Sequence, residues 1–228
     1  MTTPPEIAQL RERIAHLERG GLSPADPSPA LATHPDLAAT LRLRAGSAYQ
    51  VDSASLALLL MSGPSRAGAW CGLVGVDDFG AEAAAGLGVE LSRTIVVPEP
   101  GEQWLEATAA LVDVATLVVL RPPSLRAGSR VAPSVAERIG ARLRERSAAL
   151  VVWGEWPRCA ARLRLTDVAW AGPGRGEGLL RSRRAVVEVR RGSGAPVRVS
   201  LGGPLPGRDP GVLTGTSLRP LTAVQEAG

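Results

Sequence analysis

A regular alternation of short apolar runs and longer amphipathic segments between residues 70 and 123 constrains the fold more than any other feature. The apolar runs at residues 71–76, 94–97 and 116–120 are too short for helices and have the continuous hydrophobicity of strands covered on both faces. Before the third run, apolar side chains recur at helical spacing over residues 104–115. The sequence therefore predicts an α/β fold with a mostly parallel sheet and helices on both faces.

The second half of the chain continues this pattern and ends in a hairpin. An amphipathic helix is predicted around Ile139, and a further core strand at residues 148–153, with the alternating residues 163–170 paired beside it. Residues 185–190 and 197–201 flank the turn sequence RGSGAP. A C-terminal antiparallel hairpin is therefore expected to complete the sheet.

Composition limits the classes of protein that need to be considered. The chain has 228 residues, enough for one domain with modest extensions. No apolar run approaches the length of about 18 residues that a membrane span needs, and no signal peptide is apparent, so we expect a cytoplasmic protein.

Cys71 and Cys159 lack metal-ligand spacing, and we expect structural thiols and no metal or cofactor. All 26 basic residues are arginine, and the net charge of +4 fits a solvated surface and a nucleic-acid role equally well.

The chain divides into four predicted parts. Residues 1–21 form an amphipathic helix with one narrow apolar stripe, which docks either on its own domain or on a partner protein. Residues 22–40 are a proline-rich linker, residues 41–201 the core, and residues 202–228 a flexible tail. The candidate partner helix carries its stripe at Ile7, Leu10, Ile14 and Leu17.

The start of the core has the arrangement of a phosphate-binding loop without its essential side chains. Residues 41–43 are predicted as a strand, followed by a turn at Gly46 and a buried apolar helix over residues 53–61. A working loop needs a lysine, which this chain lacks, and Asp52 would repel phosphate. Arg121 stands where a Mg²⁺-binding aspartate would follow the third strand. The loop part of this degenerate nucleotide site comprises Gly46, Ser47, Asp52, Ser53 and Ser55.

Several segments together resemble the core of the RecA family. They are WCGLVGVDDFG, the run from LGVELSR to PEPGEQ, VATLVVL, and the closing arginine-rich hairpin. The resemblance implies a RecA-like, P-loop NTPase-type fold in which Val76 occupies the place of the catalytic glutamate, with Asp77 directly after it. It also implies that the second DNA-binding loop is reduced to residues 154–158. A chain with these departures is not expected to be a recombinase.

A short RecA-like chain with a degenerate ATP site resembles the ImuA-type mutasome proteins, in particular their divergent actinobacterial branch. The resemblance implies a noncatalytic accessory subunit of a DNA-damage-induced, error-prone translesion synthesis complex. The partners it implies are a Y-family polymerase homologue of the ImuB type, an error-prone C-family polymerase and RecA.

Arginines in two loops and in the hairpin form the candidate binding surface. Such a cluster neutralises DNA phosphates without reading sequence, binds an acidic protein partner, or protects an exposed edge strand, and the sequence leaves these three roles open. The residues of this DNA or partner surface are Arg126, Arg130, Arg158, Arg181, Arg183, Arg184, Arg190 and Arg191.

Two other functional classes remain as alternatives. The first is a RecA-like ATP-dependent DNA-binding ATPase with an atypical nucleotide site. The second is a small-molecule-binding α/β domain that uses the glycines of GLVGVDDFG. Those glycines depart from the G-x-G-x-x-G spacing of dinucleotide-binding loops, so close packing explains them better.

Overall fold

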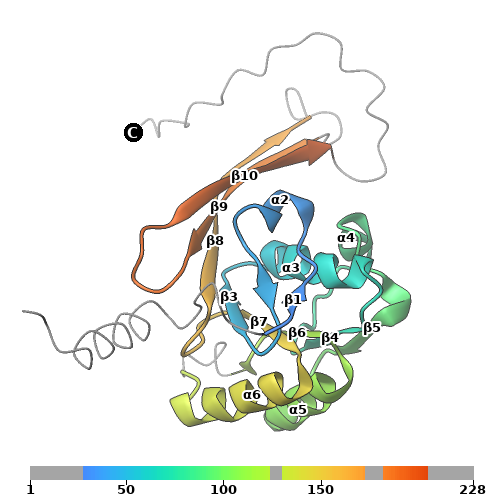
Figure 1. The fold of residues 1–228 in the computed structure, drawn as a ribbon. Helices are drawn as coiled ribbons and strands as arrows, with labels where there is room; N and C mark the ends of the chain where they lie inside the picture. Colours follow the sequence, from blue (N-terminus) through green and yellow to red (C-terminus); the bar gives the residue numbers. More distant parts are fainter. Residues whose placement is uncertain (1–27, 124–129, 173–181, 205–228) are drawn as a thin grey trace, which may run out of the picture.

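The structure is a computed structural model that describes residues 28–123, 130–172 and 182–204 (Figure 1). Its main element is an eight-stranded sheet in the order β10-β9-β8-β3-β7-β6-β4-β5. The strands from β8 to β5 in this order are parallel, and β8, β9 and β10 pair antiparallel. The strand bounds are β3 Ala48–Val51, β4 Cys71–Val74, β5 Thr94–Val97, β6 Leu117–Leu120, β7 Ala149–Trp153, β8 Ala161–Ala171, β9 Ser182–Arg190 and β10 Val197–Pro204.

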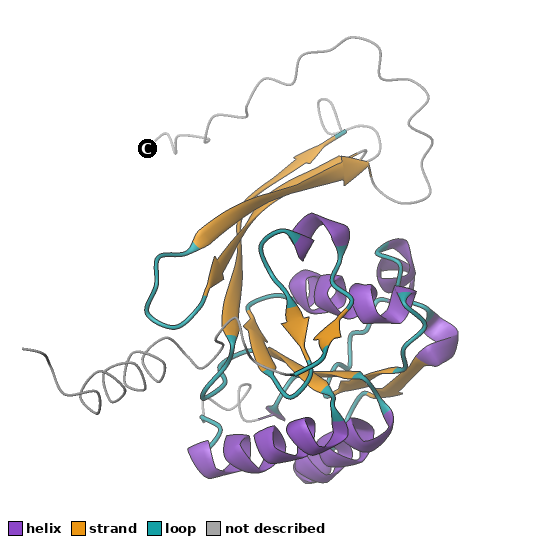
Figure 2. Ribbon diagram, in the orientation of Figure 1, coloured by secondary structure: helices purple, strands orange, loops and turns teal. Residues whose placement is uncertain are grey.

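Helices cover both faces of the parallel part of the sheet, as Figure 2 shows. One face packs against α3 (Ala54–Arg66) and α4 (Ala81–Gly86), and the other against α5 (Trp104–Val114) and α6 (Pro133–Arg146). Alternate residues of one strand enter opposite cores: Val119 lies in the α3 core and Val118 in the α5–α6 core. The predicted α/β fold, with its C-terminal antiparallel hairpin, is confirmed. The shorter elements are β1 Ala30–Leu31, α2 Pro35–Ala38, β2 Leu43–Arg44, η1 Leu91–Arg93 and η2 Gly101–Gln103.

The central helix, α3, is buried along nearly its whole length. The Ser53 hydroxyl oxygen accepts a hydrogen bond from the Leu56 N–H and so caps the helix N-terminus. Every residue from Leu56 to Ser65 is buried, as expected for a helix without a polar face. The helix continues past Gly63 and Pro64 to Arg66, beyond the end at residue 61 that the sequence predicts.

The central strand β3 was not predicted, and its presence corrects the expected topology. The sequence predicts a strand at residues 41–43 that leads through a turn at Gly46 to the helix. Instead, residues 43 and 44 form β2, which pairs with β1 in a separate two-stranded sheet. Strand β3 follows and lies between β7 and β8, so residues 163–170 do not pair beside β7 as expected. A strand of four residues that includes Gln50 has too little apolar pattern to be recognised locally.

The predicted linker also packs partly on the core. Its described residues 28–40 contain β1 and α2, and the Leu37 side chain is fully buried. Helix α2 contacts β10, which curves over it in Figure 1. The folded unit therefore begins before residue 41.

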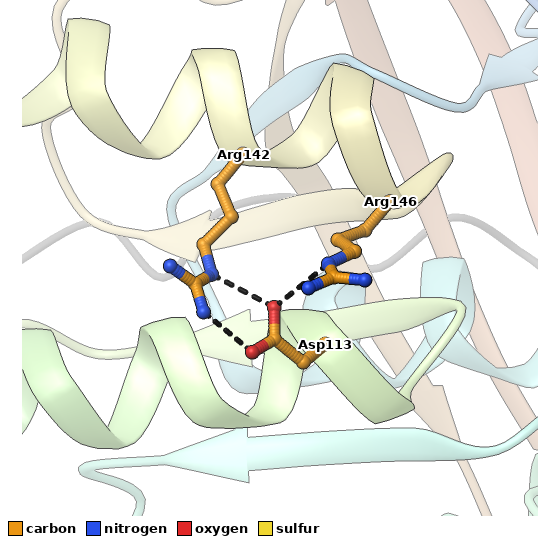
Figure 3. Close-up of polar contacts among 3 residues, drawn as sticks. All are labelled: Asp113, Arg142 and Arg146. Atoms are coloured by element: carbon orange, nitrogen blue, oxygen red, sulfur yellow. Dashed lines mark hydrogen bonds and ion pairs between the residues drawn. The ribbon is translucent and has the colours of Figure 1, made fainter.

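An ion-pair cluster joins α5 to α6 (Figure 3). Arg142 donates through Nε and Nη2 to the two carboxylate oxygens of Asp113, with an Nε–Oδ1 distance of 2.8 Å. Arg146 Nε lies 3.2 Å from the same Oδ1. The hydrogen bonds from Arg142 are the largest cause that lowers the pKa of the Asp113 carboxyl below its ordinary value.

This lowered pKa predicts a pH-dependent contribution to stability. Because the folded-state pKa of Asp113 is below the unfolded value, its contribution is present at neutral pH and is lost as the pH falls through the folded-state pKa. Asp113→Asn is therefore expected to lower the free energy of unfolding at pH 7, with the difference from wild type shrinking in acid. Urea unfolding at several pH values measures this. Glu106→Gln, at an exposed position on the same helix, is the control. A difference that stays constant across the acid range would contradict the assignment.

Candidate functional site

The sheet has a groove at the edge where its parallel strands end. The groove has a volume of about 870 Å³. It lies where β8 continues past the end of β3, and ligands of open α/β sheets bind at this carboxyl edge. Its lining residues are Gln50, Val51, Asp52, Arg121, Trp153, Gly154, Glu155, Arg162, Leu163, Arg164, Glu188, Arg190 and Pro196.

The connection from β3 to α3, where a phosphate-binding loop is expected, consists of Asp52 and Ser53 alone. The two carboxylate oxygens of Asp52 each lie 3.2 Å from the Leu165 N–H nitrogen, which donates to them. Arg164 Nε lies 3.8 Å from the same carboxylate. A phosphate-binding loop needs a run of free backbone N–H groups to surround the phosphates, and this two-residue connection cannot supply one.

The hairpin covers Ser55 in the first turn of α3. Arg183, on β9, donates through Nη1 to the Ser55 hydroxyl oxygen at 3.1 Å, and its guanidinium lies 5.1 Å from the Trp170 ring centroid. The Arg183 Nε is buried and has no hydrogen-bond partner among the described residues. Arg183 was predicted on the exposed binding surface, but it faces the core side of the hairpin.

Asp77 and Arg121 meet at the ends of β4 and β6. Arg121 Nη1 lies 3.5 Å from Asp77 Oδ1 and 3.3 Å from Asp78 Oδ1. The Arg121 guanidinium carbon also lies 4.0 Å from the Trp153 ring centroid, a cation–π contact. The arginine at the expected metal-binding position is therefore held by two carboxylates and an aromatic ring.

Gly46 and Ser47 do not belong to this site, which corrects the prediction. They precede β3, whereas Asp52 follows it, so the strand separates them by about 13 Å at about 3.3 Å per residue. The Gly46 N–H donates to the Ala148 carbonyl at 2.7 Å, at the amino edge of the sheet. The predicted loop was placed too early because β3 was not recognised. The structure brings together Asp52, Ser53, Ser55, Asp77 and Arg121 at the carboxyl edge.

The other predicted surface arginines are spread over several elements. Arg130 pairs with Glu155 at 3.3 Å, and Arg158 with Glu137 at 3.3 Å. Arg191 donates to the Thr40 carbonyl. Arg184 and Arg190 are exposed on β9. Outside the described residues lie Arg126, Arg181 and the candidate partner helix with Ile7, Leu10, Ile14 and Leu17.

The groove contains residues that sequence reasoning missed. Gln50 lines it, and its Oε1 accepts hydrogen bonds from the Trp156 N–H and from Arg162 Nε, both at 3.3 Å. Arg162 and Arg164 alternate with apolar residues in β8, so the pattern ARLRL was the signal that two arginines share one face. No comparable signal marked Gln50, because its strand was not recognised.

The two cysteines offer no nucleophile near this edge. Burial raises the pKa of the Cys71 thiol to about 12. Burial also raises the pKa of Cys159, which lies beside Gln50. Both thiols therefore remain protonated at neutral pH. In the described ranges, no group of His, Cys, Asp and Glu side chains could hold a metal ion, and none of the helices there has the length and apolarity to span a bilayer.

Comparisons with known proteins cover the part of the chain that contains this edge. Residues 36–158 match the family model described as the MT3502 N-terminal domain. A protein of Mycobacterium tuberculosis, described as uncharacterized protein Rv3395c, is 36% identical over 110 residues, which are 48% of this chain and 52% of that protein. The chain thus matches about half the length of this relative. Because the family match extends over more than half of the chain, from α2 to the residues after β7, the protein belongs to the MT3502 N-terminal domain family.

Proposed function

We propose that this protein is a noncatalytic accessory subunit, similar to the ImuA-type proteins, of a DNA-damage-induced error-prone translesion synthesis complex. The observation that carries the proposal is the closed connection between β3 and α3. Its Asp52 carboxylate bonds to the chain's own Leu165 N–H, and Arg183 covers the first turn of the helix through Ser55. A RecA-like core in this state is suited to binding other proteins rather than to hydrolysing ATP.

The arrangement around this connection supports the RecA-like part of the proposal. Strand β7 lies between β3 and β6, and all three are parallel. The connection after β3 and the residue after β6 therefore end at the same edge, where a phosphate loop and a metal-binding residue would act together. Here that second residue is Arg121, which bonds to Asp77 and Asp78 instead of a metal ion.

Exposed apolar side chains at the opposite edge support a role in protein assembly. Trp70 and Val114, just before β4 and at the end of α5, are 48% and 62% exposed. The chain segments that carry them are joined where the Thr116 N–H donates to the Trp70 carbonyl. Large exposed apolar side chains that lie together are typical of protein-binding surfaces. The partners we propose are the Y-family polymerase homologue, the error-prone C-family polymerase and RecA.

Calorimetric titration with Mg·ATP tests the noncatalytic part of the proposal. We expect no binding heat and no phosphate release, because Asp52 and Ser53 leave no room for a phosphate loop. Tight binding, or turnover that Asp52→Ala abolishes, would contradict the proposal and favour the ATPase alternative.

Affinity capture from DNA-damaged cells tests the accessory role. We expect the tagged full-length chain to recover the Y-family polymerase homologue. If the predicted apolar stripe makes this contact, Leu10→Asp with Leu17→Asp should abolish recovery, whereas Arg11→Asp with Arg19→Asp, on the polar faces of the same predicted helix, should not. Repeated absence of the polymerase homologue where it is expressed would overturn the accessory role.

A further inference from the structure

Three arginines on one face of β8 and β9 line the groove at the carboxyl edge. Arg162 and Arg190 are direct cross-strand partners, and Arg164 lies two residues along the same face from Arg162. Like charges directly opposite each other in an antiparallel pair destabilise it. This pairing is therefore a cost to the fold that neighbouring acids or a bound anion must offset.

The neighbouring acids each have partners other than Arg162 and Arg190. Glu188 accepts from Arg198 Nε and Nη2 at 2.8 and 2.6 Å, and Glu155 pairs with Arg130. Asp52 accepts from the Leu165 N–H, and its carboxylate lies 3.8 Å from Arg164 Nε. Within the described ranges the Arg190 guanidinium has no hydrogen bond or ion pair, and that of Arg162 donates only to the uncharged Gln50.

The strand register places the Arg162 and Arg190 side chains next to each other on one face of the sheet. Adjacent strands lie about 4.8 Å apart, so the side chains of direct cross-strand partners can converge on one anion. Guanidinium forks bind the oxygens of phosphate and carboxylate groups through paired hydrogen bonds. Arg164 and Arg121 also line the groove, and its four arginines outnumber its three carboxylates, those of Asp52, Glu155 and Glu188.

We propose that this groove binds the phosphodiester backbone of single-stranded DNA, with Arg162 and Arg190 holding a phosphate. The groove is partly open to solvent, so a polymer can lie in it without being enclosed. Arg121 lies over the Trp153 ring, and guanidinium planes and aromatic rings are surfaces on which bases of single-stranded nucleic acids stack. DNA binding by this groove is separate from the accessory role, because it needs no partner protein and can be measured with the purified chain.

Fluorescence anisotropy with a labelled oligothymidylate of about 20 nucleotides tests the proposal, since sites of this kind cover about 4–16 nucleotides. The wild-type chain should bind at low salt and weaken steeply between about 50 and 200 mM salt. Arg162→Ala with Arg190→Ala should weaken binding at least tenfold. It should also reduce the slope of log affinity against log salt by roughly 0.7, because the two arginines hold one phosphate and each neutralised phosphate of a single strand contributes about 0.7.

A matched double variant controls for the loss of overall charge. Arg66→Ala with Arg138→Ala removes the same number of positive charges from exposed positions that do not line the groove. It should bind oligothymidylate within about twofold of wild type. Charges outside the groove attract the DNA only from a distance, and dissolved salt screens that attraction. Equal loss in both double variants would overturn the groove as the site, as would no binding by the wild-type chain.

A third variant tests the charge of Arg162 without removing the arginine. Gln50→Glu keeps an oxygen that accepts from the Trp156 N–H and from Arg162 Nε, but it gives Arg162 a carboxylate partner. We expect weaker DNA binding with an unchanged midpoint of urea unfolding.

Competition separates the sources of the anion: unlabelled oligothymidylate should displace the probe, whereas thymidine monophosphate, inorganic phosphate and polyglutamate at equal anion concentration should not. Equal displacement by any of these three would overturn the assignment to single-stranded DNA.

Discussion

Gly63→Ala is expected to lower the free energy of unfolding by about 3 kcal/mol, at the upper end of the range for overpacked interiors. Gly63 lies in the buried part of α3, where the segment before α2 crosses the helix. A Cβ at this position would lie 2.5 Å from the Ala32 carbonyl oxygen and 2.9 Å from the His34 nitrogen. Both atoms belong to the backbone, so neither can move aside as a flexible side chain would.

The same substitution in α6 should have the opposite sign. A Cβ at Gly140 would meet only the end of the Arg144 side chain, at 3.6 Å, an ordinary contact. Gly140→Ala is therefore expected to raise the free energy of unfolding by about 0.5–1 kcal/mol through helix propensity. Urea unfolding of both variants measures the two effects. If Gly63→Ala were as stable as Gly140→Ala, the packing of residues 32–34 on α3 would be wrong.

Leu60→Ala is expected to lower the free energy of unfolding by about 2–5 kcal/mol. Leu60 has no exposed surface and lies in the middle of α3. Its core also contains Val51, Leu117 and Val151 from three neighbouring strands. The substitution removes apolar atoms and leaves a cavity that the surrounding strands cannot close, because each is held in the sheet on both sides.

The matched control is Leu91→Ala, which removes the same atoms at a position that is 40% exposed. Its expected effect is within about 1 kcal/mol, because little apolar surface is lost from the interior. Urea unfolding of the wild type and the two variants measures both effects. The comparison is valid if the free energy of unfolding depends on urea concentration with the same slope in all three proteins. Similar losses for both variants would contradict the central position of α3.

Local hydrophobic pattern was sufficient to predict most of the sheet and its helices. Strands β4, β5, β6 and β7 are continuous apolar runs, and α6 repeats its apolar residues at helical spacing, so each could be recognised from its own residues. Strand β3 could not, because Gln50 interrupts a very short run. Helix α3 was predicted too short because Gly63 and Pro64 are helix-breaking residues in isolation.

The candidate site likewise has residues that local sequence could place and residues that it could not. The carboxyl edge could be predicted for Arg121, because it directly follows a recognised strand of the parallel sheet. Asp52 was expected there through a strand at residues 41–43, although the strand it follows is β3. Gly46 was assigned wrongly, because the position of β3 decides which residues form the connection. Arg183 was assigned wrongly to the exposed surface, because only the pairing register of β9 decides which of its alternate residues face the core.

The sequence by itself determined the α/β class, the buried character of α3 and the absence of the lysine that a phosphate-binding loop needs. These properties depend on residue identity and on short-range periodicity, which a chain carries before it folds. Only the tertiary structure decided that Arg162 and Arg190 are opposite each other beside Gln50. That arrangement depends on strand order and register, which come from contacts between residues far apart in the chain, and a shift of one residue would turn these side chains to the other face.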